Sequence, residues 1–198
     1  MIENKIKIAG TKHAVHELIK NRWSPRAFNS EMVPRDLINS LFEAAIWAPS
    51  SRNEQPWRFI YGCKSEDKNY DKIFSTLAPR NQIWAKDAPM LVLTVAKKYS
   101  GHNNQENFYA LYDLGQAVSN FSLQATSLNL FCHQMGGFDK EKATELFELK
   151  PDFIPVTVIA VGYLGNPDIL PDDFRELELK ARTRNELELT VYKDEFKP

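Results

Sequence analysis

The apolar run from Met90 to Ala96, directly after Pro89, constrains the fold of this chain more than any other stretch. Its residues are aliphatic or β-branched with little alternation of polar positions, which indicates a strand buried on both faces. Region 107–130 predicts a long helix whose apolar residues spread too widely for one stripe, so this helix should be buried nearly all round. Both elements therefore need neighbouring elements that cover their apolar surfaces.

The rest of the hydrophobic pattern adds shorter elements to this framework. It predicts further helices over 13–20, 37–46 and 140–149 and further strands over 57–61 and 156–163. The first of these strands should end at Gly62. Helices and strands both occur along the chain, and we expect an α+β fold. No linker or repeat divides the chain, so we expect one domain that spans residues 1–198.

Composition excludes several classes of protein. The formal net charge of −1 argues against general nucleic-acid binding, which needs a clustered basic surface. The N-terminus lacks the apolar segment of a signal peptide and no run approaches the length of a membrane span, so we expect a cytoplasmic protein with no membrane partner. Cys63 and Cys132 have no metal-ligand spacing and should be reduced and packed; we expect no metal site.

The stretch Asn21–Phe28 is the first of two polar motifs that carry chemistry. Arg22, Ser24 and Arg26 alternate along it, and alternate residues of an extended segment point the same way. Arginine suits phosphate because its fixed fork donates two parallel hydrogen bonds, and a serine adds another donor. An alternative interpretation makes Ser24 a helix N-cap, with Pro25 at the first helical position.

The second motif runs from Ala48 to Trp57. Within it, Asn53 and Gln55 each offer a donor and an acceptor, as the edge of a flat heterocycle requires. Taken alone, either motif could be a polar surface turn. Together, in this order and joined by an amphipathic helix, they favour a ligand site.

The two motifs resemble those of the FMN-dependent nitroreductase family. The resemblance covers nearly the whole chain, continuing through Asn81, Asp87-Ala88-Pro89, Asp113-Leu114-Gly115, Met135–Asp139, Val161-Gly162-Tyr163 and the pair Arg182 and Arg184. It implies a central mixed β-sheet flanked by helices, an FMN cofactor, and an intertwined homodimer with FMN sites at the interface.

The resemblance implies a role for each basic residue. Arg22 and Ser24 would hold the FMN phosphate, and Arg182 and Arg184 would meet it from the other end of the sequence. Arg26 would lie by the N1 and O2 edge of the flavin ring, where a cation stabilises the charge left by reduction. Without the resemblance, a pair such as Arg182 and Arg184 is more often a pair of solvated surface charges.

The second motif would complete the cofactor site from the other subunit. In the family, positions that match Ser50, Ser51 and Asn53 close over the flavin from the partner, and Pro49 and Gln55 belong to the same binding segment.

Three further matches concern the flavin ring itself. Asn81 would contact its pyrimidine edge. At Met135, Gly136 and Gly137 a backbone N–H would lie beside flavin N5, because glycine lets backbone approach a planar ring closely. The alternative is a plain turn before the helix at 140–149, capped by Asp139.

The C-terminal segment 186–192 alternates polar and apolar residues, which is typical of a strand. The polar stretch 166–184 before it should carry the chain away from its own core. Two interpretations are open: an edge strand of its own sheet, or, as the resemblance implies, a strand exchanged onto the partner's sheet.

The resemblance implies an NAD(P)H-dependent oxidoreductase. Hydride would pass to flavin N5 and then to an acceptor such as a nitroaromatic or quinone, in a ping-pong cycle. The sequence has no G-x-G-x-x-G motif for a resident dinucleotide, and we expect no catalytic side chain because the flavin carries the chemistry. The alternatives are a specialised dehalogenating or flavin-consuming member, a non-catalytic FMN-storing or FMN-sensing protein, and a globular protein without a ligand.

Overall fold

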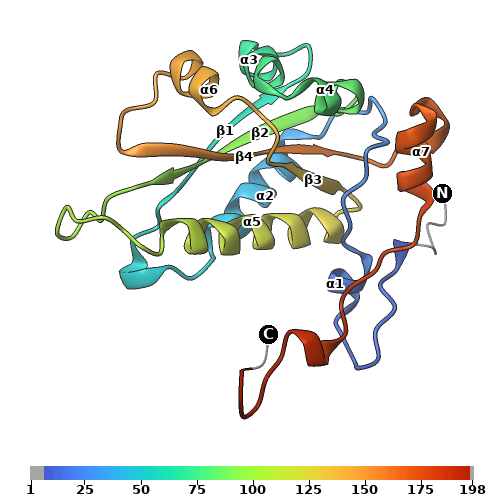
Figure 1. Cartoon of the computed structure of the whole chain (residues 1–198). Coiled ribbons are helices and arrows are strands. Elements are labelled where there is room, and N and C mark those ends of the chain that lie inside the picture. Colours follow the sequence, from blue (N-terminus) through green and yellow to red (C-terminus); the bar gives the residue numbers. More distant parts are fainter. Residues whose placement is uncertain (1–6, 197–198) are drawn as a thin grey trace.

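A four-stranded sheet lies at the centre of the structure, a computed structural model that describes residues 7–196 (Figure 1). Its strands are β1 (Trp57–Cys63), β2 (Met90–Lys97), β3 (Phe131–Met135) and β4 (Phe153–Gly162), in the order β1-β2-β4-β3. All three neighbouring pairs are antiparallel. The α+β class is confirmed, but the sheet formed by the described residues is antiparallel where we expected a mixed one.

Helices cover both faces of the sheet. On one face lie α2 (Arg35–Ile46) and α5 (Ala110–Ser127); on the other lie α3 (Lys68–Thr76), α4 (Pro79–Ala85) and α6 (Lys140–Leu146) (Figure 1). The helices expected at 37–46, 107–130 and 140–149 correspond to α2, α5 and α6 with bounds shifted by a few residues. None of the helices within residues 7–196 has the length and apolar character to cross a membrane.

Strand β2 is buried on both faces, as its sequence predicts. Met90 and Val92 belong to the core cluster under α2 and α5, whereas Leu91 and Leu93 belong to the cluster on the opposite side. Each of these four side chains is at most 1% exposed. The two cores on either side of β2 make the rigid frame that positions the surrounding loops.

Helix α5 corrects one expectation, because a single chain does not bury it all round. Its inward face includes Leu114 and Phe121, but Leu111 and Tyr112 on its outward face are 56% and 67% exposed. Phe108, just before the helix, is 90% exposed. The apolar residues on this outward face therefore point to solvent in the isolated chain.

Strand β1 continues through Gly62, where we expected it to end. A Cβ at this position would lie 2.1 Å from the backbone nitrogen of Tyr70 on α3, far inside van der Waals contact. Glycine is therefore used here for the close approach of a helix to the strand, not as a terminator.

The N-terminal segment 7–22 and the C-terminal segment 180–196 lie side by side for part of their length and extend away from the sheet (Figure 1). The N-terminal segment includes α1 (Glu17–Asn21), which overlaps the helix expected at 13–20 but starts later and extends one residue further. The C-terminal segment follows α7 (Asp172–Leu179). The interpretation of 186–192 as an edge strand of its own sheet is wrong, since residues Leu187–Leu189 form a 3-10 helix; the exchange of this segment onto a partner's sheet stays a prediction. The segment meets no sheet edge of its own chain, so the alternating pattern has no strand to pair with.

Candidate functional site

The segment 22–27 is extended, and no helix begins there, so the N-cap interpretation of Ser24 is wrong. Arg22, Ser24 and Arg26 are half-buried, while the residues between them are buried. The alternation expected from the sequence is thus present, with three polar side chains on one side of the segment. Arg22 Nη1 lies 3.4 Å from Ser24 Oγ and donates to it.

His133 on β3 holds the middle of this segment. Its Nδ1 lies 2.8 Å from the carbonyl oxygen of Pro25, and because a carbonyl only accepts, Nδ1 carries the proton and donates. The imidazole packs 4.4 Å from the ring of the buried Trp84. Burial lowers the pKa of His133 to about 4, with the nearby Arg26 acting in the same direction against the hydrogen bond to Pro25. The ring is therefore neutral at physiological pH.

Glu178 on α7 holds the end of the same segment. Its carboxylate accepts hydrogen bonds from the backbone N–H of Arg26, at 2.9 Å and 3.0 Å, and from that of Ala27, at 3.0 Å. Glu178 is only 3% exposed. Backbone N–H groups that would otherwise be unpaired next to the cleft are satisfied in this way.

The segment lines a cleft of about 370 Å³ together with residues from both ends of the chain. Among the described residues that form the cleft, six are cationic and one is acidic; they are Lys7, Arg22, Arg26, Lys180, Arg182, Arg184 and Glu178. The late basic pair and the first motif are therefore brought together, as the resemblance implied. Such an excess of positive charge in one cleft favours an anionic ligand.

The cations of the cleft act on one another. Burial lowers the pKa of Arg22, and the neighbouring Arg184 lowers it further. The pKa of Arg182 is also lowered, first by burial and then by Arg22 and Arg184. Within residues 7–196, no carboxylate forms an ion pair with Arg22, Arg26 or Arg184. A bound anion would relieve this repulsion.

Part of the Arg182 side chain is used for hydrogen bonds within the chain. Its Nη1 donates to the backbone carbonyl oxygens of Lys7 and Lys20, at 2.9 Å and 2.8 Å. In return, Lys7 Nζ donates to the carbonyl oxygens of Leu177 and Lys180. These bonds join the N-terminal segment to the C-terminal one. Arg184 is an exposed residue of the cleft, and among the described residues its side chain donates only from Nη1 to the neighbouring Thr183 carbonyl, at 2.8 Å.

Asn81 and the two glycines form one hydrogen-bonded unit after β3. Asn81 Nδ2 donates to the carbonyl oxygen of Gly137 at 2.9 Å. A Cβ on Gly137 would lie 3.0 Å from that same nitrogen, whereas a Cβ on Gly136 would meet nothing within 4 Å. Among the described residues, the N–H groups of both glycines have no acceptor. The expected cap is also present, since Asp139 accepts from Lys142 N at 2.9 Å and starts α6. Met135, the last residue of β3, is buried and faces the core.

Phe174 of α7 links this unit to the cleft. The guanidinium carbons of Arg26 and Arg80 lie 5.8 Å and 4.7 Å from the centroid of its ring. Arg80 also pairs with Asp173 at 2.9 Å. Because Arg80 precedes Asn81, the polar residues run in order from the cleft, past Phe174, to the Gly136-Gly137 turn.

The second motif lies apart from the cationic cleft. The turn that contains Ser50, Ser51 and Asn53 lies beyond the N-terminal end of α5, whereas the cleft lies beside α1 and α7 at the other side of the molecule (Figure 1). Ser51 N donates to the buried carboxylate of Asp113 at 3.0 Å, and Gln55 N donates to Ser50 Oγ at 3.0 Å. A single chain therefore does not bring this motif, including Pro49 at its start, to the cationic cleft.

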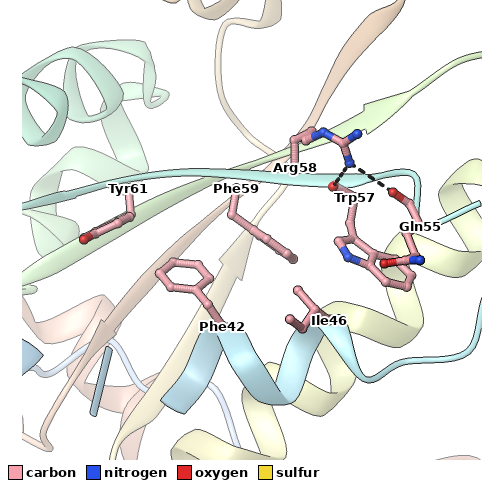
Figure 2. A pocket seen from close by; sticks show the side chains of 7 residues that line it. All are labelled: Phe42, Ile46, Gln55, Trp57, Arg58, Phe59 and Tyr61. Atoms are coloured by element: carbon pink, nitrogen blue, oxygen red, sulfur yellow. Dashed lines mark hydrogen bonds between the residues drawn. The ribbon is translucent and has the colours of Figure 1, made fainter. Parts of the chain in front are cut away.

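Gln55 lies at the end of an apolar hollow of about 330 Å³ between α2 and β1. Figure 2 shows that the hollow is lined mainly by aromatic and aliphatic side chains; the lining residues are Phe42, Ile46, Gln55, Trp57, Arg58, Phe59 and Tyr61. Arg58 points away from it and donates from Nη1 to the carbonyl oxygens of Gln55 and Trp57. The hollow follows β1, which is an edge strand of the sheet.

Sequence reasoning missed several residues of the cleft. Lys7 and Lys180 lie outside any motif, and nothing in the local sequence separates them from ordinary surface lysines. Glu178 lies in a stretch we expected to be polar and remote from the core. His133 belongs to none of the motifs, and its contact with Pro25 gives it a structural role.

Comparison with known proteins gives the following matches. Residues 19–163 match a family model described as "Nitroreductase family". A protein of Methanothermobacter thermautotrophicus named "Putative NADH dehydrogenase/NAD(P)H nitroreductase" is 31% identical over 176 residues, which cover 85% of this chain and 88% of that protein. A Synechocystis protein named "Protein DrgA" is 29% identical over 148 residues, with 62% of this chain and 70% of that protein covered.

Solved structures give the same picture. The crystal structure of an oxidoreductase containing FMN is 31% identical, with a TM-score of 0.90 over 95% of this chain and 96% of that one. A nitroreductase family protein from Clostridium difficile 630 is 23% identical, with a TM-score of 0.71 over 90% of this chain and 97% of that one, and supports the fold alone. The fold that the sequence motifs led us to expect is thereby confirmed.

Proposed function

This chain belongs to the nitroreductase family of oxidoreductases, and from that membership we propose that it transfers reducing equivalents from NAD(P)H to a small-molecule acceptor with FMN as its cofactor. The observation that carries the proposal is the cationic cleft, where four guanidinium groups without an ion pair to a carboxylate among the described residues lie with a serine hydroxyl. The 31% identical structure of an oxidoreductase containing FMN supports the same cofactor here.

The residues present fit FMN at both of its ends. Arg22, Ser24 and Arg184 supply charge-assisted donors for a phosphate dianion, and Arg182 adds charge beside them. At the other end, the missing Cβ of Gly136 leaves space at an exposed backbone N–H, which a planar ring can approach.

A bound FMN would supply the redox chemistry, accepting a hydride from NAD(P)H and passing it to an acceptor such as a nitroaromatic or quinone. Arg26 lines the cleft and contacts Phe174, whose ring also contacts Arg80 next to Asn81; its guanidinium would stabilise negative charge that develops on reduction. The chain itself binds, orients and stabilises charge, and we propose no side chain as nucleophile or proton donor.

We propose a homodimer with the site shared between subunits. The two motifs that resemble FMN-binding segments lie at opposite sides of one chain (Figure 1). Near the second motif, the apolar side chains of Trp47, Phe108 and Tyr112 are 79%, 90% and 67% exposed. Exposed apolar surface of this kind marks an interaction site, and a second copy that covers it would carry its own second motif to the cleft.

The C-terminal tail offers a second contact between subunits. Leu187, Leu189 and Val191 are 51%, 66% and 65% exposed in the isolated chain. The edge of β1, with the apolar hollow of Figure 2 beside it, is available to a strand from outside the chain. We propose that the tail pairs with the partner's sheet, where its alternating pattern would be satisfied.

The visible spectrum of the purified protein tests the cofactor directly. A yellow protein that releases FMN on denaturation supports the proposal, and a colourless protein that does not bind added FMN contradicts it. Steady oxidation of NAD(P)H with a quinone then separates an enzyme from a protein that stores or senses FMN. Parallel double-reciprocal lines would support the further proposal that NAD(P)H and acceptor use one site in turn; intersecting lines would contradict it.

A further inference from the structure

Glu178 is the one acidic side chain in the cleft that the described residues form, and its position is unexpected in a site for an anion. The carboxylate faces the backbone N–H groups of Arg26 and Ala27, with the Lys7 ammonium and the Arg26 guanidinium as the cations that act on it. It lies on the inward face of α7, one helical turn after the buried Phe174.

The charge of Glu178 works against the proposed ligand. A carboxylate next to a phosphate site repels the phosphate, and burial itself disfavours the ionised form. Burial raises the pKa of Glu178, although the two backbone N–H donors and the cations Arg26 and Lys7 oppose this rise. A neutral residue here would repel a phosphate less, so attraction for an anionic ligand does not explain a glutamate.

The geometry does explain it. A single carboxylate accepts from two consecutive N–H groups, which fixes how the extended segment is turned about its own axis. His133 holds the same segment at the carbonyl of Pro25, from β3. With both contacts made, the side chains of Arg22, Ser24 and Arg26 are left on the cleft side.

We propose that Glu178 is a positioning residue that orients the segment 22–27 so that its guanidinium and hydroxyl groups converge on a phosphate-bearing ligand. The identity of that ligand as FMN rests on the proposed function. The alternatives are that Glu178 acts only through its charge, or only through the stability of the fold.

The substitution Glu178→Gln separates these alternatives, because the loss of the charge and the loss of the positioning contacts have opposite effects on FMN affinity. Removing a negative charge from a cationic cleft would tighten binding of a dianion if charge alone mattered. Loss of an acceptor that matches both N–H groups would loosen the segment and weaken binding. We expect the FMN dissociation constant, measured by quenching of flavin fluorescence, to rise at least tenfold. Glu176→Gln removes the same charge from an exposed position on α7 and should change it less than twofold.

Two further measurements keep the inference open to contradiction. Thermal unfolding of the apoproteins identifies a purely structural role, in which Glu178→Gln lowers Tm but leaves the affinity of the folded protein unchanged. Glu178→Asp keeps the charge but withdraws the carboxylate by one methylene. The positioning role predicts weaker FMN binding for this variant as well, and an unchanged affinity would overturn it, including in the case that Glu178→Gln does not fold.

The pH profile gives an independent readout. In the wild type, FMN affinity should fall as the pH is lowered through the raised pKa of Glu178, because the protonated acid accepts less well. The FMN phosphate near pH 6 and His133 near pH 4 contribute steps of their own. Those two steps should remain in Glu178→Gln while the Glu178 step disappears. Identical profiles would contradict the inference.

Inorganic phosphate, followed by the fluorescence of Trp23 in the cleft wall, distinguishes the two proposals. If the wild type binds phosphate but not FMN, the proposed function fails while the role of Glu178 is still measured with phosphate. If the wild type binds FMN and Glu178→Gln binds it equally well, the role of Glu178 fails alone.

Discussion

Single guanidinium groups decide whether the cleft can hold a phosphate. Arg22 and Arg184 have no carboxylate partner among the described residues, so their hydrogen bonds are available to a ligand. A hydrogen bond to a charged group contributes about 1.5–3 kcal/mol, so we expect Arg22→Ala or Arg184→Ala to weaken FMN binding by roughly one to two decades. Titration with FMN measures this directly.

Arg175→Ala is the matched control for these two variants. Arg175 lies on α7 and pairs with Asp168 at 2.9 Å, outside the cleft. Its loss should leave FMN affinity unchanged within about twofold, because exposed ion pairs contribute little. If all three variants bind FMN like the wild type, Arg22 and Arg184 are not phosphate ligands.

His133 makes the stability of the folded chain depend on pH. Its pKa falls from 6.5 to about 4 in the folded chain, so the fold favours the neutral ring. Its contribution to stability is therefore complete above pH 6.5 and is lost as the pH falls toward 4. By linkage, we expect the wild type to lose about 2–3 kcal/mol between pH 7 and 4.5 that His133→Gln does not lose.

Urea unfolding at the two pH values measures this difference. Glutamine keeps a donor for the Pro25 carbonyl but does not titrate, which makes the variant a close comparison. Glu178 acts with the opposite sign, since its raised pKa favours the fold in acid, but it is present in both proteins and cancels. Equal acid sensitivity in both would show that His133 is not the titrating group.

At the scale of secondary-structure elements, the C-terminal tail is the part whose role depends on a second chain. Its alternating pattern fits a strand, yet in one chain it leaves Leu187, Leu189 and Val191 exposed. If it pairs with the partner's sheet, truncation before Glu186 should shift the protein toward monomer and increase loss of FMN. Sedimentation and flavin content of the gel-filtered protein measure both.

A milder variant controls for damage by truncation. Replacing Leu187, Leu189 and Val191 with serine keeps the tail but removes its apolar side. We expect the same shift toward monomer. A truncated protein that stays dimeric and yellow would contradict the exchange of the tail.

The elements that the sequence predicts well are those whose burial shows in their own residues. Strand β2 is a continuous apolar run and helix α2 carries apolar side chains at helical spacing, and both are present. Helix α7 was missed because its two buried positions are Phe174 and Glu178, while Leu177 and Leu179 are 43% and 47% exposed. Because one of the two buried positions is acidic, the sequence of α7 lacks the apolar spacing that predicts a helix.

Strand β3 was missed for a related reason. The sequence of β3 includes His133 and Gln134, so it lacks a clear alternation of polar and apolar residues. The helix predicted over 107–130 also ends directly before β3, with no turn residues that separate the two elements in the prediction. The cleft was predictable in part, since Arg22, Ser24 and Arg26 form a local motif. Lys7 and Glu178 reach the same cleft through tertiary contacts, which no local pattern encodes.

For the whole molecule, the distance between the two motifs matters most. The cleft lies beside α1 and α7, and the turn with Ser51 and Asn53 lies past the other end of α5 (Figure 1). A ligand that needs both motifs therefore needs two chains. The outward face of α5, which the sequence suggested was buried and which one chain leaves exposed, agrees with a covering partner.

Mixing two defective variants tests the shared site. Arg22→Ala damages the cleft and Asn53→Ala damages the second motif, so each homodimer should bind FMN weakly. In a heterodimer of the two, one site has both defects while the other combines an intact Arg22 with an intact Asn53. Co-expression and purification of the heterodimer should therefore restore about half of the wild-type FMN content and NAD(P)H oxidation. If each site is built within one chain, every site in the heterodimer still has one defect, and no restoration will be seen.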